Sequence, residues 1–327
     1  MRRTVAWLIS AVTMLSLVTG VRAWAAAPAL TDAAGIHVVA ASRLDDRLLE
    51  VTMATDALGQ DVRVRILQPT GYAADPQRTY PVLYLLHGGT DDYRSWTDKG
   101  DAEAITAGLP LLVVMPDAGP GGWYSNWYNL GAYGTPEWET FHIGRLIPWV
   151  EANFRTAAGP QGRAVAGLSM GGFGAMSYAA RHPGLFSSAM SFSGAVDTRQ
   201  LPVTAVVDIS PLATLDVPTA VWGLKLLNAD IWRAHDPWEH AGDLAGLNLG
   251  IYTGNGLPGP YDTRPLPDSS VVTESAVQQM SRALHDKLTR LGIAHVYRDY
   301  GPGTHSWPYW QRDLRWALPS VMQAFGT

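Results

Sequence analysis

The sequence Ala-Val-Ala-Gly-Leu-Ser-Met-Gly-Gly, residues 164–172, joins an apolar strand to a helix through a tight turn. Residues 164–168 have the continuous apolar character of a buried strand, and the residues after Ser169 are rich in Gly and Ala. Small neighbours let the backbone bend sharply and lift the Ser169 hydroxyl to the edge of a sheet. In this setting the pattern Gly-x-Ser-x-Gly predicts a nucleophilic serine rather than an ordinary glycine-rich turn between a strand and a helix.

Residue patterns on either side of this turn alternate between strands and helices. Leu-Leu-Val-Val-Met at 111–115 is typical of a strand covered on both faces, whereas 61–67 alternates like a half-buried strand. The repeated order of strand and helix predicts an open, doubly wound, mostly parallel α/β sheet with helices on both faces. Strands are expected at 61–67, 82–86, 111–115, 164–168, 189–192, 249–253 and 295–300, and helices at 139–153, 172–181, 274–291 and 311–325.

The stretch near 200–247 does not follow this alternation of strands and helices. It contains Trp222, Trp232 and Trp238 together with several prolines, which favours a cap-like insertion over a further strand and helix. We therefore expect residues 28–327 to form a single catalytic domain.

Two backbone amides are candidates for holding an oxyanion beside Ser169. The amide of Met170 would lie at the start of a helix, where an unpaired N–H and the helix dipole favour negative charge. His87-Gly88-Gly89-Thr90 follows an apolar strand and is similar to a loop that supplies a second donor, so we nominate the Gly89 amide. The alternative is a plain glycine turn after a strand.

A general base is expected after the last strand, because a triad in this kind of sheet runs Ser, Asp or Glu, then His. Of the nine histidines, only His295 and His305 lie beyond residue 290. His295 opens an expected strand, whereas His305 lies in the turn-rich sequence Gly-Pro-Gly-Thr-His-Ser-Trp, which makes His305 the predicted base. Order along the chain does not identify the catalytic acid, because Asp262, Asp268 and Glu274 all precede His305.

Composition and the N-terminal sequence restrict the partners and the location that we expect for this protein. Hydrophobic residues make up 47% of the chain and charged residues 16%, and the net charge is -5, so a nucleic-acid partner is not expected. Arg2 and Arg3, an apolar run from Val5 to Val18 and the small residues near Ala25 predict a cleaved secretory signal over 1–27 and a secreted protein. The run is too short to span a bilayer, and the absence of cysteine excludes a cysteine nucleophile.

Several blocks resemble, in the same order, those of the mycolyltransferase (antigen 85) family within the esterase-D-like α/β hydrolases. The resemblance covers residues 50–325, and its most specific block is His305-Ser306-Trp307. It implies the α/β-hydrolase fold, a glutamate acid that maps onto Glu274, and oxyanion donors at Gly89 and Met170. The blocks lie at 138–141, 167–170, 235–237, 252–256 and 303–310.

Glu274 also has a physical argument in its favour. Thr273 has the character of a helix N-cap, which would put Glu274 in the first turn, where the helix dipole keeps a carboxylate ionised. Asp262 and Asp268 lie within or beside a Pro- and Gly-rich run, where a solvated turn residue is the ordinary role.

The sequence departs from this family near the substrate. His87-Gly88-Gly89-Thr90 replaces Asp-Gly-Leu-Arg, so the arginine implicated in holding trehalose is absent. We therefore predict a serine esterase acting on a small-molecule or lipid acyl ester, and predict that hydrolysis outcompetes transfer of the acyl group to a sugar. An acyltransferase of the mycolyl type is the first alternative.

The second alternative is a non-catalytic, exported carbohydrate- or matrix-binding protein that uses the aromatic run at 123–128 as a sugar platform. The expected chemistry needs no cofactor and no metal ion. The side chains nominated to contact substrate are His87, Thr90, Trp127, Ser306 and Trp307.

Overall fold

The computed structural model describes residues 29–263 and 269–326, and the predicted signal at 1–27 lies outside these residues. In this part of the chain nine strands form one sheet in the order β1-β2-β3-β5-β4-β6-β7-β8-β9. β1 to β3 are antiparallel to their neighbours, and β5, β4 and β6 to β9 run parallel. The strands are β1 (Ile36–Arg43), β2 (Leu48–Thr55), β3 (Val62–Leu67), β4 (Val82–Leu86), β5 (Leu112–Pro116), β6 (Arg163–Leu168), β7 (Ser188–Phe192), β8 (Asn248–Thr253) and β9 (Val296–Asp299).

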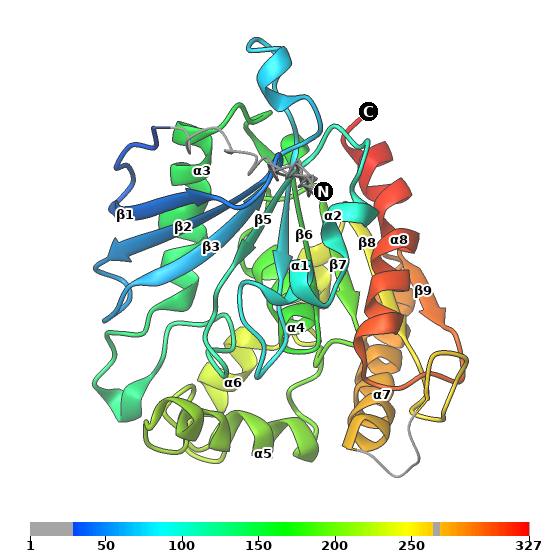
Figure 1. The fold of residues 1–327 in the computed structure, drawn as a ribbon. Coiled ribbons are helices and arrows are strands. Elements are labelled where there is room, and N and C mark those ends of the chain that lie inside the picture. The colour runs from blue at the N-terminus through cyan, green and yellow to red at the C-terminus, as the bar shows by residue number, and fades with distance from the viewer. Residues whose placement is uncertain (1–28, 264–268, 327) are drawn as a thin grey trace, which may run out of the picture.

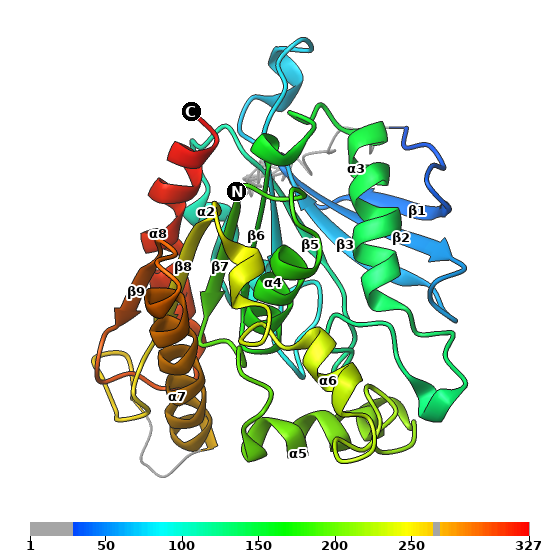
Figure 2. The same ribbon diagram turned by 180° about the vertical axis from the view of Figure 1, so that it is seen from behind.

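Helices cover both faces of this sheet, as Figures 1 and 2 show from opposite sides. One face carries α3 (Ile147–Asn153), α4 (Met170–Arg181) and α7 (Ser269–Arg290). The other carries α1 (Ser95–Asp98), α2 (Ala102–Ile105) and α8 (Trp307–Ala324). The predicted doubly wound α/β sheet is therefore confirmed. A π-helical segment, Thr140–Leu146, continues into α3, and β1 and β2 are strands that the sequence analysis did not predict.

Successive residues of the central strands divide between two apolar cores, because a strand's side chains alternate between the faces of its sheet. In β4, Tyr84 packs with the α3, α4 and α7 side, which contains Trp149 and Phe173. Leu85 packs with the opposite side, which contains Trp310. Burial on both faces explains why this strand reads as an unbroken apolar run.

The insertion predicted near 200–247 folds as helical segments and not as further strands. It contains α5 (Leu201–Ile209), a 3-10 turn at Ser210–Thr214, α6 (Ala229–His235) and a 3-10 turn at Ala241–Leu244. Both views place α5 across one end of the molecule, below α4 and beside α7 (Figures 1 and 2). Within residues 29–263 and 269–326, no helix combines the length and hydropathy that a membrane span requires.

Candidate active site

Ser169 lies at the sharp turn between β6 and α4. Its φ of 52° and ψ of −118° place it in a region that residues other than glycine rarely adopt. The turn is held by hydrogen bonds from the Ser169 amide to the carbonyl oxygen of Phe192 and from the Phe173 amide to that of Ser169, at 2.9 and 3.0 Å. A Cβ atom on Gly171 would lie 2.5 Å from the carbonyl oxygen of Leu86, so the close approach of α4 to β4 requires glycine there.

His305 lies between Ser169 and Glu274 and is within hydrogen-bonding distance of both. Its Nε2 is 2.8 Å from Ser169 Oγ, and its Nδ1 is 2.7 Å from Glu274 Oε2. A carboxylate only accepts hydrogen bonds, so we assign the ring proton to Nδ1, which leaves Nε2 free to accept the serine proton. The edge of His305 also packs against Trp310, with ring centroids 4.9 Å apart, which restrains the imidazole.

Glu274 is fully buried on α7, where an unpaired carboxylate would be very costly. Its Oε1 accepts hydrogen bonds from the Gly254 amide at 2.7 Å, Ser193 Oγ at 2.8 Å and Thr253 Oγ1 at 3.1 Å. Together with His305, these donors compensate for the hydration that the buried carboxyl group has lost.

The predicted position of Glu274 in the first turn of its helix, after an N-cap at Thr273, is wrong. α7 begins at Ser269, so Glu274 lies in its second turn, and Thr273 is a helical residue and not the N-cap. The dipole of a helix acts mainly on its first turn. The Glu274 carboxyl group is instead held by donors from the carboxyl ends of β7 and β8, which meet at the same edge of the parallel sheet.

The other two candidates for the catalytic acid are Asp262 and Asp268. Asp262 accepts from Thr304 Oγ1 at 2.5 Å, from Tyr309 OH at 2.6 Å and from the Gly259 amide at 2.7 Å. These contacts tie the loop that carries His305 to the segment after β8, so Asp262 is a positioning residue in this arrangement. Asp268 lies outside the described residues.

The other late histidine does not face Ser169. His295 Nε2 is 2.7 Å from His285 Nδ1, and the pair lies between α7 and β9. This position agrees with the structural role expected for His295.

Gly89 and Met170 line the same cavity as Ser169. Neither amide forms a hydrogen bond with the described residues, whereas the next amide, that of Thr90, donates to the carbonyl oxygen of Pro120 at 3.0 Å. Two unpaired N–H groups beside the serine are the arrangement that a developing oxyanion needs.

Two of the five nominated substrate contacts are corrected by the structure. His87 is buried, with Nδ1 2.7 Å from the Gly88 carbonyl oxygen and Nε2 2.9 Å from the Ala118 amide nitrogen, so it supports the glycine loop from beneath. Trp127 is buried in the core and donates to Gly122. Sequence alone gave no sign of this burial. The other three, Thr90, Ser306 and Trp307, line the cavity.

The aromatic run at 123–128 does not form an exposed platform. Trp123, Tyr124 and Trp127 are all buried, and Trp123 packs edge-on against Phe173. They pack in the core beneath the cap, and Trp123 also lines the cavity that contains Ser169.

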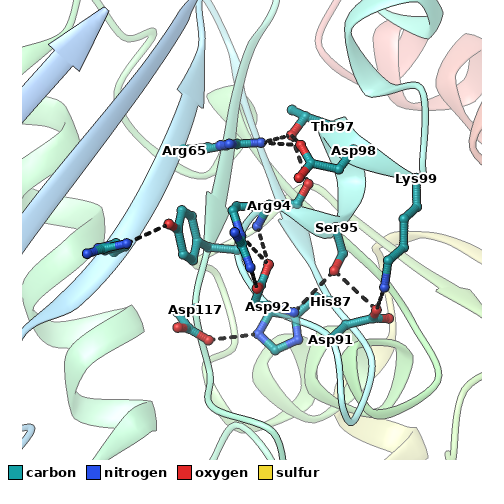
Figure 3. A network of polar contacts seen from close by, with 12 residues as sticks. Arg65, His87, Asp91, Asp92, Arg94, Ser95, Thr97, Asp98, Lys99 and Asp117 are labelled. Atoms are coloured by element: carbon teal, nitrogen blue, oxygen red, sulfur yellow. Dashed lines mark hydrogen bonds and ion pairs between the residues drawn. The ribbon is translucent and has the colours of Figure 1, made fainter. Parts of the chain in front are cut away.

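A polar network holds the loop that follows β4 and carries Gly89 (Figure 3). Asp91 accepts from Lys99 Nζ at 2.9 Å and from Ser95 Oγ at 3.1 Å, and Asp92 pairs with Arg94 at 2.6 Å. These contacts close the loop on itself through its own side chains, which keeps a donor near Ser169 in place.

The cavity above Ser169 has a volume of about 870 Å³. Ser169, His305 and the glycine loop line it, and so do the apolar side chains of Val206 and Ile209 from the cap. This volume lies in the range of small-molecule sites, and these apolar side chains suit an acyl chain.

Sequence reasoning missed Ser193, which donates to Glu274 Oε1 and accepts from Trp310 Nε1 at 3.1 Å. It directly follows β7, and a polar residue just after a buried parallel strand is the signal that could have found it.

The nine-stranded sheet with helices on both faces, and a serine at the sharp turn after β6, define the α/β-hydrolase fold. The comparisons with known proteins agree. The sequence model of a family described as Putative esterase matches residues 55–321. Esterase Rv1288 of Mycobacterium tuberculosis is 39% identical over 84% of this chain, and the chain spans 59% of that relative's length. Diacylglycerol acyltransferase/mycolyltransferase Ag85A of M. tuberculosis is 31% identical over 83% of this chain and 79% of the relative.

Among solved structures, M. tuberculosis MPT51 has a TM-score of 0.69 at 26% identity, covering 83% of this chain and 96% of its own. The chain therefore belongs to the antigen 85-like esterase family.

Proposed function

We propose that this protein is an exported serine esterase that cleaves carboxylic esters through an acyl-enzyme, with Ser169 as nucleophile, His305 as general base and Glu274 as acid. The observation that carries the proposal is the unbroken line of hydrogen bonds from Glu274 through His305 to Ser169, at 2.7 and 2.8 Å. That line ends in a cavity lined by Gly89 and Met170.

In the proposed reaction, Ser169 Oγ attacks the ester carbonyl carbon while His305 Nε2 takes its proton. The carbonyl oxygen becomes an oxyanion, which the amides of Gly89 and Met170 stabilise. The imidazolium, paired with Glu274, returns the proton to the leaving alcohol. Water then attacks the acyl carbon while His305 takes a proton from it. The bond from that carbon to Ser169 Oγ breaks as His305 returns the proton to Oγ, which releases the carboxylic acid and restores the serine.

Transfer to a sugar hydroxyl would proceed through the same acyl-enzyme, and the 31% identity with an acyltransferase favours it as the second candidate. Hydrolysis is preferred because Thr90 stands where the resemblance would place an arginine, and a threonine supplies no charge-assisted donors to a sugar. Product analysis with a short acyl donor, water and trehalose separates the two. Free acid should dominate, and mainly acylated trehalose would favour the transferase.

The first test is turnover of short-chain p-nitrophenyl esters by wild type, Ser169→Ala and the matched control Ser320→Ala. Ser320 is on α8, where its hydroxyl bonds only to the Ala317 carbonyl oxygen in the described chain. Ser169→Ala should lose kcat by several orders of magnitude, on the order of 10⁴ or more, while Ser320→Ala stays near wild type. Wild-type turnover in Ser169→Ala would exclude Ser169 as nucleophile.

Export and domain organisation belong to the same proposal. The N-terminal sequence at 1–27 supports cleavage of a secretory signal, with 28–327 as one catalytic domain. Mass spectrometry of the protein recovered from culture medium measures the cleavage site directly. Recovery of the uncleaved chain only from cells would contradict export.

A further inference from the structure

The cap presents an apolar face to solvent. In α5, Val203 and Val207 pack inward, whereas Leu201, Val206 and Ile209 are exposed. The following turn exposes Leu212 and Leu215, and Leu201 and Leu215 are 82% and 96% exposed. A helix that is apolar on both sides is expected inside a protein or a membrane and not at a surface. We call Leu201, Val206, Ile209, Leu212 and Leu215 the cap face.

Folding alone does not account for this face. Leu215 has a φ of +64°, a left-handed conformation that glycine and asparagine adopt far more readily than leucine. Leucine at this position is thus unfavourable for the backbone conformation, and its exposed side chain is also unfavourably hydrated. A contact made only when the protein binds something else would compensate for both.

The cap face is continuous with the cavity that contains Ser169. Val206 and Ile209 are exposed to solvent and also line that cavity. Tyr261, which is 46% exposed, lines the cavity as well. An acyl chain lying against the cap face would therefore meet Val206 and Ile209 where it enters the cavity that contains Ser169.

We propose that the cap face docks on aggregated neutral or zwitterionic lipid, and that the acyl chain of a water-insoluble ester passes from that surface over Val206 and Ile209 to Ser169. This inference rests on the proposed esterase function and names its substrate class. The protein would take long-chain esters presented at a lipid surface in preference to dissolved ones.

The chemistry of the face favours lipid over a protein partner. Its members are all Leu, Ile or Val, whereas protein interfaces depend on Trp, Tyr and Arg anchors. Lys225, the only cation within 201–227, donates to the Thr198 carbonyl oxygen and to Thr204 Oγ1, so it points into the protein. Without an outward cation the face has no means of attracting anionic headgroups, so anionic lipid should not strengthen docking.

The test places a fluorescent label on the face itself. The chain has no cysteine, so Ala205→Cys, at an exposed position of α5, gives a unique site for an environment-sensitive dye. In the Ser169→Ala background, phosphatidylcholine vesicles should shift the emission of this label to the blue. A label at Val39→Cys on β1, which lies well away from α5 in Figure 1, should not respond. Adding phosphatidylglycerol should not increase the response.

A triple variant tests the face by removal. Leu201→Gln, Leu212→Gln and Leu215→Asn remove exposed side chains that do not line the cavity. Vesicle binding reported by the Ala205→Cys label should weaken by roughly tenfold or more. The matched control Val39→Thr, Leu44→Gln and Leu291→Gln removes the same number of exposed aliphatic residues elsewhere and should bind like the parent.

The outcomes separate this inference from the proposed function. With Ser169 intact, both triple variants should hydrolyse short soluble esters at the parent rate. No vesicle response at residue 205, or an equal response at residue 39, would overturn the docking proposal. Blue-shifted emission of the label at residue 205 in the absence of lipid would also overturn the docking proposal, because the chain itself or a second copy would then cover the cap face. Vesicle docking without any ester hydrolysis would instead refute the esterase.

Discussion

Glu274→Gln tests the assignment of the acid most sharply, because the hydrogen bonds dictate how the new amide must lie. The Gly254 amide, 2.7 Å from Oε1, is a fixed backbone donor, whereas the hydroxyls of Ser193 and Thr253 can rotate. The glutamine oxygen must therefore face Gly254, and its NH₂ group must face His305 Nδ1. That nitrogen then becomes an acceptor, so the ring proton moves to Nε2 and points at the serine.

An imidazole in this tautomer cannot accept the serine proton. The kcat of Glu274→Gln should fall by about 10³ to 10⁴, equivalent to roughly 4–5.5 kcal/mol of barrier. The alternative orientation would oppose the Gly254 N–H with an NH₂ group and leave buried donors unpaired, at a cost of about 1–3 kcal/mol.

The assay is kcat on p-nitrophenyl butyrate, with thermal unfolding to verify that the variant folds. Asp262→Asn is the comparison, because both carboxylate oxygens of Asp262 accept hydrogen bonds that hold the His305 loop, from Thr304 and Tyr309. It should lose activity by roughly tenfold or less. A loss below about tenfold in Glu274→Gln, or a larger loss in Asp262→Asn, would refute the reasoning.

Three further variants probe the groups around the site. Ser193→Ala removes one donor from Glu274 and should lower kcat about tenfold with little change in KM; an unchanged kcat would show that this hydroxyl is dispensable. Burial raises the pKa of Asp313 from 3.8 to about 7, so the folded protein binds this proton more tightly than the unfolded chain, and wild-type stability falls as pH rises from about 4 to about 7. Asp313→Asn should flatten that fall by up to about 3 kcal/mol, measured as unfolding free energy at pH 4.5 and pH 8, and parallel profiles would contradict the shift. A Cβ on Gly167 would lie 2.3 Å from the Gly171 carbonyl oxygen, so Gly167→Ala should lower the free energy of unfolding by more than about 2 kcal/mol in urea titrations, whereas wild-type stability would show that the turn can relax.

Local pattern was enough to predict the strands from β3 to β9 and the position of Ser169, but not β1 and β2. The apolar runs that became β4, β5 and β6 are continuous because both faces of these strands are covered. The residues around Ser169 are small because the backbone of this turn lies within van der Waals distance of β4. That close approach restricts the side chains allowed in the turn itself, so it is visible in the local sequence. His305 was predictable for a similar reason, because it follows the last strand in a turn-rich loop.

Long-range contacts decided the rest. Order along the chain placed Asp262, Asp268 and Glu274 equally well before His305. The family resemblance preferred Glu274, and the local argument that put it in the first turn of a helix was wrong about that position. In the fold, Glu274 faces His305 because the loops after β7 and β8 supply its donors, whereas Asp262 is engaged by Thr304 and Tyr309.

Burial was the second property that sequence did not reveal. His87 and Trp127 lie in motifs that favour a role at the surface of the site, yet both are enclosed by elements distant in sequence. A sequence pattern specifies backbone conformation, because steric and capping preferences act between near neighbours. Which side chains face the cavity depends on how those elements pack, and that is a property of the tertiary structure alone.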